Sequence, residues 1–326
     1  MISVLIPVYN CERYLLDALE SVESQSFRNY EAVLVEAGST DRSASICDSW
    51  CVAHSRFKCV HLKNNMGVSF SRNKALSMAE GDMIAFLDAD DFYSPDALSV
   101  MYDTMERTGA DMVSCGYFEQ HQHAATDFIE MEDEGLDLRV MEGARFVNGP
   151  MLNGDSHCWG KLFKRNIIGD KKFPEDLTIG EDMLFLLSVT GGNKRVSTIY
   201  GYKGYGYRTN PEGAMLKPFT PKVMDQITCW ERAADIMGHS DRIDSAVVTN
   251  AVLTASRISQ LPFLKKGRYK KELQICREKI REYYRPELRN LLPEGYPVKV
   301  DLLMSTPSLY SHLYSILSKG KRLVNG

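Results

Sequence analysis

Three aspartates in four positions follow a short apolar segment, and their types and spacing point to cation chemistry. Met83–Leu87 predicts a buried strand, and Asp88, Asp90 and Asp91 come directly after it. Like charges this close repel one another unless a cation or hydrogen-bond donors compensate them. A hard divalent ion with oxygen ligands, Mg²⁺ or Mn²⁺, would compensate them and could then bridge a diphosphate. A strand-to-helix loop whose aspartates cap turns is the structural alternative.

The sequence on either side of this acidic loop predicts the elements that position it. Short apolar runs alternate with segments of helical periodicity over the first 115 residues. Strands are expected at Ile2–Val8, Glu31–Val35, Lys58–Leu62, Met83–Leu87 and Asp111–Cys115, and helices near residues 15–22, 42–53, 68–79 and 95–108, the last with Ser94 as N-cap and Gly109 as its end. Strands separated by single helices indicate βαβ units, so we expect an α/β fold with a mostly parallel sheet flanked by helices. Ligands of such sheets bind at the carboxyl ends of the strands.

Composition and motifs exclude several classes of protein. The chain has 326 residues, of which 44% are hydrophobic and 25% charged, as in an ordinary soluble globular protein. Its formal net charge of -4 argues against a basic nucleic-acid binder, so no nucleic acid is expected as a partner. The first strand is not followed by Gly-x-Gly-x-x-Gly, and no Gly-x-x-x-x-Gly-Lys-Ser/Thr occurs. These absences argue against a dinucleotide dehydrogenase and a P-loop kinase.

The sequence carries no sign of export or of a membrane span. No apolar run approaches the roughly 18 residues that a span needs, and strand-like sequence begins at Ile2 with no basic segment before it. The eight cysteines form no Cys-x-x-Cys pair, so we interpret them as reduced thiols of a cytoplasmic protein. Cys47 and Cys51 have the spacing of half a helical metal site, but semi-buried apolar residues are the simpler interpretation.

The regular alternation ends after residue 116, which indicates a second region. Residues 127–142 are acidic and predict an exposed loop or hairpin. From Thr220 onward the pattern is nearly all helical, with Thr220 and Pro221 as a cap and first helical position. Turn residues near 209–218 mark the boundary. We therefore expect one domain at 1–210 and a helical C-terminal subdomain at 211–326.

Eight short motifs along the first domain resemble the family 2 glycosyltransferases with the GT-A fold. In chain order they are Val4–Asn10, Ser21–Phe27, Gly38–Asp41, Asn65–Gly67, Ser71–Asn73, Phe86–Asp91, Cys158–Phe163 and Gly180–Asp182. Each motif alone is weak, but all eight stand in the family's order and cover roughly residues 1–208. The helical C-terminal region has no such signature, and in this family that part varies.

The resemblance implies a metal-dependent enzyme. It would move a hexose or N-acetylhexosamine from a nucleotide diphosphate donor, usually a UDP-sugar, to an acceptor hydroxyl with inversion. The acceptor would be a growing glycan or lipid-linked glycan in cell-surface polysaccharide biosynthesis, and the cofactor Mn²⁺ or Mg²⁺. The sugar, the acceptor and the linkage cannot be read from these residues.

The resemblance also implies roles for individual residues. The donor-binding residues are expected to be Pro7, Val8, Tyr9, Asn10, Glu36, Arg72, Asp88 and Arg208. Tyr9 would offer a ring face to the nucleobase, although a strand-end aromatic explains it as well. The Arg72 guanidinium would fork onto phosphate or base oxygens, with a surface ion pair as the close alternative. Arg208 would belong to a mobile lid, Tyr205–Asn210, over the diphosphate; a loop or an antiparallel edge strand with exposed tyrosines is the alternative.

The remaining candidate residues serve the metal, the acceptor and the chemistry. Asp90 would bind the metal ion. Asp182 would take the proton of the attacking hydroxyl, with Glu181 hydrogen bonding the acceptor; plain compensation of a helix dipole also explains this pair. Trp159 would stack on an acceptor sugar or lie in the core, and His157 would bind the acceptor or be an ordinary histidine.

One position departs from the family pattern. Members commonly have Asp-Asp-Gly-Ser after the second strand, where this chain has Glu36-Ala37-Gly38-Ser39. Ala37 has no side-chain group that could bond the nucleobase or ribose, so the donor nucleotide is less certain than the fold. This departure also motivates an alternative function, a nucleotide-sugar-binding pseudoenzyme or partner subunit. A nucleotidyltransferase is a third candidate, although the Gly- and Arg/Lys-rich loop expected of it is missing after the first strand.

The C-terminal region offers a candidate surface for partners. Residues 265–289 hold ten lysines and arginines against four glutamates, and apolar residues recur on one helical face. A basic amphipathic helix of this kind can rest on an anionic membrane, which would place the protein at the inner face of the cell membrane. The alternative is a solvated helix whose apolar face meets the body of the protein. A homodimer through the C-terminal helices is the other contact considered.

Overall fold

The structure, a computed structural model, describes residues 1–120, 136–209 and 219–314. The chain divides into two compact units, one of Met1–Asp176 with Glu181–Ala214 and one of Leu177–Gly180 with Met215–Gly326. The boundary expected at residue 210 falls in the segment 210–218, outside the described residues, so its exact place stays a prediction.

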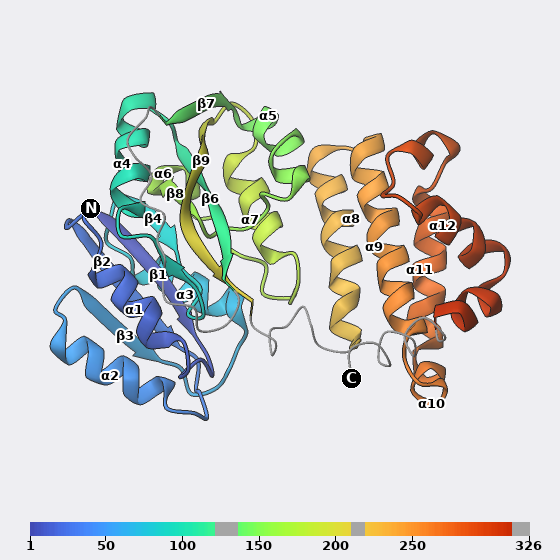
Figure 1. Ribbon diagram of the computed structural model, residues 1–326, viewed down its shortest axis with the longest axis horizontal. Coiled ribbons are helices and arrows are strands. Elements are labelled where there is room, and N and C mark those ends of the chain that lie inside the picture. The colour runs from blue at the N-terminus through green and yellow to red at the C-terminus, as the bar shows by residue number, and fades with distance from the viewer. Residues whose placement is uncertain (121–135, 210–218, 315–326) are drawn as a thin grey trace. The chain divides into compact units, whose positions relative to one another are not determined.

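A nine-stranded sheet forms the centre of the first unit (Figure 1). Its strands are β1 (Ile2–Val8), β2 (Tyr30–Glu36), β3 (Phe57–His61), β4 (Met83–Phe86), β5 (Phe92–Tyr93), β6 (Met112–Gln120), β7 (Asp137–Glu142), β8 (Lys161–Lys164) and β9 (Arg195–Arg208). Their order is β3-β2-β1-β4-β8-β6-β9-β5, with β7 beside β9. β3, β2, β1 and β4 are parallel, β8 is antiparallel to both β4 and β6, and β6 is again parallel to β9. The expected α/β fold is confirmed, and its parallel part is the half built from the first four strands.

Helices follow the strands of this unit as the alternation predicts. They are α1 (Leu15–Glu23), α2 (Ser43–Ala53), α3 (Val68–Met78), α4 (Ala97–Thr108), α5 (Gly143–Asn148), α6 (Arg165–Ile168) and α7 (Glu181–Thr190). Helix α4 ends at Gly109 in the left-handed conformation, as expected, but its N-cap is Asp96 rather than Ser94. Ser94 instead bonds to β9, since its backbone N–H donates to the Gly204 carbonyl and its hydroxyl to the Lys203 carbonyl.

The parallel register brings the candidate loops to one edge of the sheet. Val8 lies opposite Glu36, so the loops after β1 and β2 begin side by side. On the other side of β1, Leu5 lies opposite Phe86, and the backbone N–H of Leu87 donates to the Leu5 carbonyl. The acidic loop that follows β4 therefore leaves the sheet at the same carboxyl edge.

Strand β9 corrects two expectations. Tyr205–Arg208 is neither a lid nor an edge strand, because β9 pairs with β6 on one side and with β5 and β7 on the other. Tyr205 is fully buried there. Asp137–Glu142, expected in an exposed loop or hairpin, is largely exposed but forms strand β7, antiparallel to β9. Residues 121–135 and Asn210 lie outside the described residues.

The second unit is helical, as expected. It contains α8 (Asp225–Met237), α9 (Asp241–Ser259), α10 (Phe263–Lys266), α11 (Lys270–Tyr283) and α12 (Tyr296–Ser305). Thr220 is the N-cap and Pro221 the first residue of a 3₁₀ turn that leads into α8. None of the helices in the described part of the chain is long and apolar enough to cross a membrane.

The basic segment of this unit packs its apolar face inward. Cys276 and Ile280 of α11 are buried in the core formed with α9, and Leu273 packs against it. Lys279 pairs with Glu231 at 2.6 Å and with Glu282 at 2.8 Å. The packed-helix alternative is therefore what the structure contains, and a membrane contact would have to use the cationic face alone.

Candidate active site

A buried arginine at the carboxyl edge of the sheet holds three carboxyl groups. Arg72 lies on α3, and its Nη1 donates to Glu181 Oε1 at 3.1 Å and to Asp182 Oδ1 at 2.5 Å. Its Nη2 donates to Asp88 Oδ1 at 2.8 Å. One guanidinium thus joins the end of β4 to the first turn of α7. We call these four residues the Arg72 cluster.

Arg72 is enclosed as well as paired. Its side chain is only 3% exposed, and its guanidinium carbon lies 5.3 Å from the centre of the Phe173 ring. Burial works to lower the pKa of Arg72, but the surrounding negative charges, with Asp182 the largest, outweigh it and raise the pKa. Of the two roles expected for Arg72, the structure contains the ion pair, but within the protein rather than at its surface.

Glu181 and Asp182 share the first turn of α7 but differ in access to solvent. Both carboxyl groups contact Nη1 of Arg72, so they lie close to each other. Burial, followed by the neighbouring Asp182 charge, raises the pKa of Glu181 to about 8, so Glu181 carries a proton at pH 7. The Asp182 side chain is 20% exposed against 11% for Glu181. Asp182 is therefore the more accessible of the two oxygen acceptors.

The acidic loop is fixed to β9 through its last residue. Asp91 is 2% exposed, and its two oxygens accept from the backbone N–H of Arg208 at 2.8 Å and from the Tyr205 hydroxyl at 2.7 Å. Burial, with the charges of Asp88 and Asp90 behind it, raises the pKa of Asp91. Asp91 is thus a structural acid, while Asp90 next to it stays partly exposed.

The oxygen ligands of the acidic loop suit a metal ion that is completed by substrate. Among the residues that the structure describes, no three His, Cys, Asp or Glu side chains form a complete metal site. Mg²⁺ and similar ions are commonly held by one or two carboxylates together with substrate phosphates. Asp88 bonds Arg72 and Asp91 is buried, so the partly exposed Asp90 is the carboxylate that fits this mode.

The loops after β1 and β2 are joined by hydrogen bonds between side chains and backbone. Asn10 adopts a φ of 47°, which asparagine tolerates better than most residues. Its side-chain oxygen accepts from the Thr40 N–H at 2.8 Å, and its own N–H donates to the Ser39 hydroxyl at 3.0 Å. Asp41 accepts from the N–H groups of Glu12 at 3.0 Å and Ser43 at 2.9 Å. We call residues 9–12 and 36–43 the clasped loops.

Glu36 is committed to the clasped loops. It is 2% exposed and accepts from the Ser39 N–H at 2.5 Å, and its other oxygen lies 3.0 Å from His61 Nδ1. Burial works to raise the pKa of Glu36, but bonds from Ser39 and His61 outweigh it and lower the pKa. Ala37 is 2% exposed, and its N–H donates to the Val8 carbonyl at 2.9 Å. A contact of Glu36 with a nucleobase stays a prediction, and it would need one of these bonds to open.

The expected nucleobase wall is partly open to solvent. Tyr9 is 44% exposed, whereas Val8 is buried and Pro7 is half-buried. Tyr9 therefore has a free ring surface beside the clasped loops, as stacking on a base would require.

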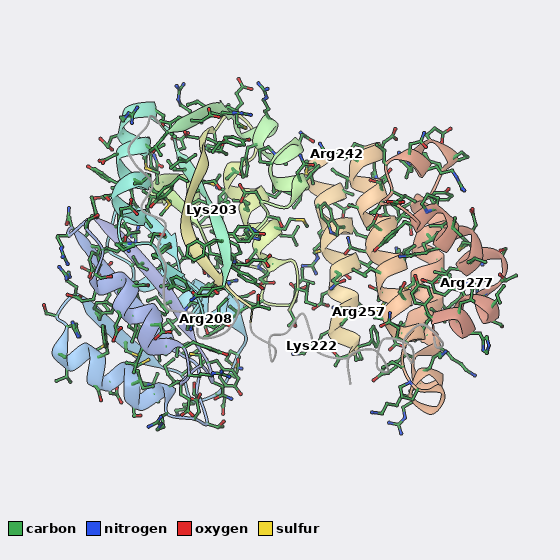
Figure 2. All side chains as sticks on the ribbon, in the orientation of Figure 1. Lys203, Arg208, Lys222, Arg242, Arg257 and Arg277 are labelled. Atoms are coloured by element: carbon green, nitrogen blue, oxygen red, sulfur yellow. The ribbon has the colours of Figure 1, made fainter. Side chains whose placement is uncertain are left out.

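Arg208 lies at the end of β9 and not in a lid (Figure 2). Its side chain is 8% exposed and donates to Asp17 on α1 at 3.0 Å. Its guanidinium carbon lies 4.9 Å from the Tyr14 ring centre and 5.4 Å from that of Phe92. These contacts give Arg208 a packing role, and its contact with a diphosphate stays a prediction.

An aromatic stack stands next to the acidic loop. Trp159 lies between His157, at 3.8 Å, and Tyr205, at 4.4 Å, and both neighbouring rings are nearly parallel to it. Tyr117, which is 40% exposed, meets Trp159 edge-on. Trp159 itself is 7% exposed, so the open surface for a sugar ring belongs to its neighbours. Burial lowers the pKa of His157 to about 3, so its imidazole is neutral.

Sequence reasoning missed the residues that support the Arg72 cluster. Asn73 Nδ2 donates to the Phe173 carbonyl at 2.9 Å, and the Phe173 N–H returns a bond to Asn73 Oδ1 at 2.8 Å. This exchange holds the ring of Phe173 against Arg72. Asn73 belongs to the Ser71–Asn73 motif and could have been named as a supporting residue from the sequence. Phe173 lies between secondary-structure elements, and no sequence pattern marks it.

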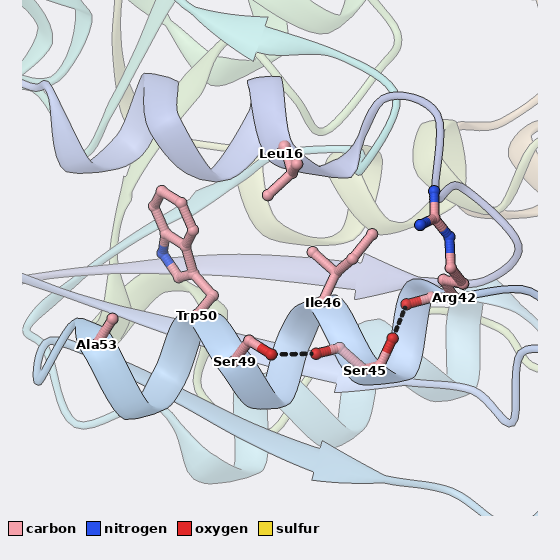
Figure 3. A pocket seen from close by; sticks show the side chains of 7 residues that line it. All are labelled: Leu16, Arg42, Ser45, Ile46, Ser49, Trp50 and Ala53. Atoms are coloured by element: carbon pink, nitrogen blue, oxygen red, sulfur yellow. Dashed lines mark hydrogen bonds between the residues drawn. The ribbon is translucent and has the colours of Figure 1, made fainter.

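A separate pocket lies between α1 and α2 (Figure 3). It is lined by Leu16, Arg42, Ser45, Ile46, Ser49, Trp50 and Ala53. The Ser49 hydroxyl donates to the Ser45 carbonyl at 2.9 Å, and the Ser45 hydroxyl donates to the Arg42 carbonyl at 2.8 Å. It shares no residue with the Arg72 cluster or the acidic loop, so the candidate chemistry lies elsewhere.

Sequence comparison identifies relatives of the first unit. The family model described as glycosyl transferase family 2 matches residues 3–168. Glycosyltransferase GlyG of Streptococcus pneumoniae is 33% identical over 118 residues, which are 36% of this chain and 39% of GlyG. The uncharacterized glycosyltransferase EpsJ of Bacillus subtilis is 27% identical over 238 residues, 69% of this chain and 66% of EpsJ. The matches thus span between about two fifths and two thirds of these curated relatives.

Structural comparison addresses the fold. The crystal structure of S. aureus TarS 1-349 in complex with UDP-GlcNAc aligns over 97% of this chain and 88% of that chain, with a TM-score of 0.69. The two sequences are 17% identical. This similarity confirms the α/β fold of GT-A type that the motifs predict.

Proposed function

The chain belongs to glycosyl transferase family 2, and from this premise we propose that it transfers a sugar from a UDP-sugar to an acceptor hydroxyl with inversion. The observation that carries the proposal is the Arg72 cluster. Asp88, Glu181 and Asp182 meet on one buried guanidinium, although α7 is 110 residues from Arg72 in the chain. A buried charge is costly to desolvate, so a fold that concentrates four ionisable groups at its ligand edge is typical of a reaction centre.

Asp182 is the proposed base. The acceptor hydroxyl gives its proton to the Asp182 carboxylate while its oxygen attacks the anomeric carbon of the donor sugar. The bond from that carbon to the diphosphate oxygen breaks, and the electron pair leaves with the nucleoside diphosphate. The exposed fraction of Asp182 and the proton on Glu181 support this division of roles, because Glu181 can then donate a hydrogen bond to the acceptor.

The donor is proposed to lie against the clasped loops. The open face of Tyr9 suits a nucleobase. The UDP-GlcNAc complex of TarS supports a UDP-sugar, with N-acetylhexosamine or hexose as the sugar class. UDP-GlcNAc is accordingly the first donor to test.

Asp90 is proposed to hold the divalent ion, Mn²⁺ or Mg²⁺. When bound, such an ion supplies a Lewis acid that neutralises charge on the departing diphosphate. The partly exposed carboxylate of Asp90 supports this assignment, as does the engagement of Asp88 with Arg72.

The acceptor is proposed to be a growing glycan of a cell-surface polysaccharide, free or linked to lipid. The partly exposed rings of His157 and Tyr117, which pack against Trp159 beside the acidic loop, support a carbohydrate, because aromatic faces and edges pack against sugar rings. A lipid-linked acceptor would bring the protein to the inner face of the membrane. The cationic face of α11 is the proposed contact for that surface.

The test combines donor binding with turnover. A panel of nucleotide sugars is screened with Mn²⁺ for thermal stabilisation, since a bound ligand raises apparent stability by mass action. The stabilising donors are then assayed for transfer and for release of nucleoside diphosphate, with Asp182→Asn as the matched inactive control. Transfer with inverted product stereochemistry supports the proposal. Binding without transfer or hydrolysis favours the pseudoenzyme that Ala37 motivates, and no binding by any donor contradicts both.

A further inference from the structure

Arg72 hydrogen bonds to acids on both sides of the proposed site, so both terminal nitrogens of its guanidinium are already occupied. Nη1 donates to Glu181 and Asp182, and Nη2 donates to Asp88. A donor phosphate would have to displace one of these bonds to bind Arg72. Nε is buried within the protein and has no hydrogen-bond partner among the described residues. The Phe173 ring lies against the guanidinium. These contacts fix the guanidinium in place and aim it at the protein's own carboxyl groups.

We propose that Arg72 is a positioning residue that holds and aims the Asp182 carboxylate as the base and compensates the charge of the two acids of α7. The proposal rests on the proposed function, because it assigns Arg72 a part in the same reaction. In this proposal Arg72 does not contact the donor. It acts on the reaction through Glu181 and Asp182, the two acids of α7.

Charge balance supports this assignment. Three ionised carboxylates around one guanidinium would leave two uncompensated negative charges in a space where Arg72 is 3% exposed. A single proton removes one of them, and the more buried Glu181 is its natural holder. Burial and the Asp182 charge raise the pKa of Glu181 to about 8, in agreement with this geometry.

The charged groups near Glu181 come from three parts of the fold. Asp182 lies on its own helix and Arg72 on α3, and the loop after β4 contributes Asp88. The Cys158 thiol lies close to the same charges, and burial raises its pKa, so it stays neutral. Arg72 is therefore a cation that compensates this set, and its removal disfavours the ionised form of Glu181.

The geometry also gives the two oxygens of the Asp182 carboxylate different partners in the chemical step. The Asp182 carboxylate binds Nη1 through Oδ1 at 2.5 Å, which fixes the orientation of the carboxyl group. The other oxygen, Oδ2, is then the one to receive the acceptor proton. If Glu181 loses its proton above pH 8, a second negative charge appears beside Asp182 and the anionic donor, so activity should fall on the alkaline side.

The test compares Arg72→Gln with Arg72→Lys and the parent protein. Arg72→Gln removes the cation, so the alkaline limb of the pH profile of kcat, which Glu181 sets, should move to higher pH by about one to three units, while the Kd of UDP-GlcNAc stays close to that of the parent. Arg72→Lys keeps the charge but loses the fork, so it should keep the parent's midpoints at a reduced kcat. A merely structural role would lower the amount of folded protein without moving the profile. A loss of donor affinity at unchanged pH midpoints would overturn the proposal and return Arg72 to the donor site.

A second measurement separates this proposal from the proposed function. Carboxyl carbons of ¹³C-labelled glutamate are followed by NMR titration, with the Glu181 signal assigned by its loss in Glu181→Gln. The signal should titrate near pH 8 in the parent protein and higher in Arg72→Gln, whether or not any sugar is transferred. Titration near the ordinary glutamate value of 4.5 in the parent would overturn the proposal, even if transfer is observed. Should Arg72→Gln fail to fold, the parent titration and Glu181→Gln, which should lack the alkaline limb of the activity profile, decide the question.

Discussion

The clasped loops and the Arg72 cluster stand at the same edge of one sheet, yet they treat their carboxyl groups in opposite ways. In the clasped loops, Glu36 and Asp41 accept hydrogen bonds from backbone N–H groups. These bonds outweigh burial, and the pKa of each is lowered. In the Arg72 cluster and the adjoining acidic loop, Glu181 and Asp91 are buried beside other carboxylates, and their pKa values are raised. Protonation at this edge is therefore set by the balance of burial and neighbouring carboxylates against hydrogen-bond donors, and not by residue type.

The difference assigns different tasks to the two regions. Ionised, bonded carboxylates shape loops and leave little capacity to exchange protons. A pair of carboxyl groups that holds one proton, such as Glu181 and Asp182, can release that proton or take up a second one near neutral pH. General acid–base chemistry requires this exchange. We therefore expect mutations in the Arg72 cluster to change rates and mutations in the clasped loops to change stability.

The largest expected effect is that of Asp182→Asn on transfer. The amide keeps the shape of the side chain but cannot take a proton at neutral pH, so the rate should fall by about 10²–10⁴-fold while donor affinity is retained. The measurement pairs calorimetry of donor binding with the transfer rate. Retained transfer would move the role of base to Glu181, and loss of donor binding would place Asp182 in the donor site.

Asp90→Ala should act on binding. The residue is partly exposed and outside the core, so its loss should leave the fold intact and remove the metal-dependent part of donor affinity. Thermal shifts with UDP-GlcNAc are compared with and without Mn²⁺. A variant that keeps the full Mn²⁺-dependent shift of the parent would show that the ion is held elsewhere.

Asp41→Asn should cost stability. The clasped carboxylate accepts from the N–H groups of Glu12 and Ser43, and hydrogen bonds to a charged group contribute about 1.5–3 kcal/mol each when broken, less where solvent has access. Because the pKa of Asp41 is lowered, its contribution is present above its ordinary value of 3.8 and is lost as pH falls through the folded pKa. Urea unfolding at pH 7 and pH 3 should show a deficit that shrinks at the lower pH. An equal deficit at both would mean that the charge is not what stabilises the loops.

Asp91→Asn is the matched contrast and should have the smallest effect. The amide resembles the protonated acid that burial favours, so the free energy of unfolding at neutral pH should not fall. Since the pKa of Asp91 is raised, the parent loses stability as pH rises above 3.8, and the variant should gain relative to it over the same range. A loss at pH 7 comparable to that of Asp41→Asn would erase the distinction between the two regions.

The sequence predicts the parallel half of the fold well because periodicity and turn residues are local signals. The five predicted strands, which correspond to β1–β4 and β6, and the four helices between them lie close to their expected places, whereas the short β5 was not predicted. Strands β1, β2 and β4 carry the candidate loops to one edge as expected. The course of β9 could not be predicted in this way. Its pairing with β6, β5 and β7 depends on contacts between segments far apart in the chain, and Tyr205 looks exposed in sequence but is buried by those contacts.

In the candidate site, too, local sequence patterns reveal which residues matter but not the contacts between segments far apart in the chain. The motifs mark Arg72 and Asp88 as candidates for donor binding and Glu181 and Asp182, which share one motif, as candidates for the chemistry. They do not reveal that Arg72 binds the three acids, since that requires the distance between α3 and α7. The commitment of Asp91 to β9 and of Glu36 to Ser39 and His61 is hidden for the same reason.

The span between Arg72 and its partners on α7 has a consequence during synthesis. A ribosome adds about 5–20 residues per second, so the 110 residues between Arg72 and Asp182 take roughly 5–20 seconds to appear. Over that time the parallel half of the sheet can form, but Arg72 has only Asp88 to pair with, and burying it so incompletely compensated would be costly. The nascent first half must therefore leave this edge hydrated until α7 arrives. A polypeptide released before Glu181 would be held open at its ligand edge, where chaperones and proteases act on incomplete chains.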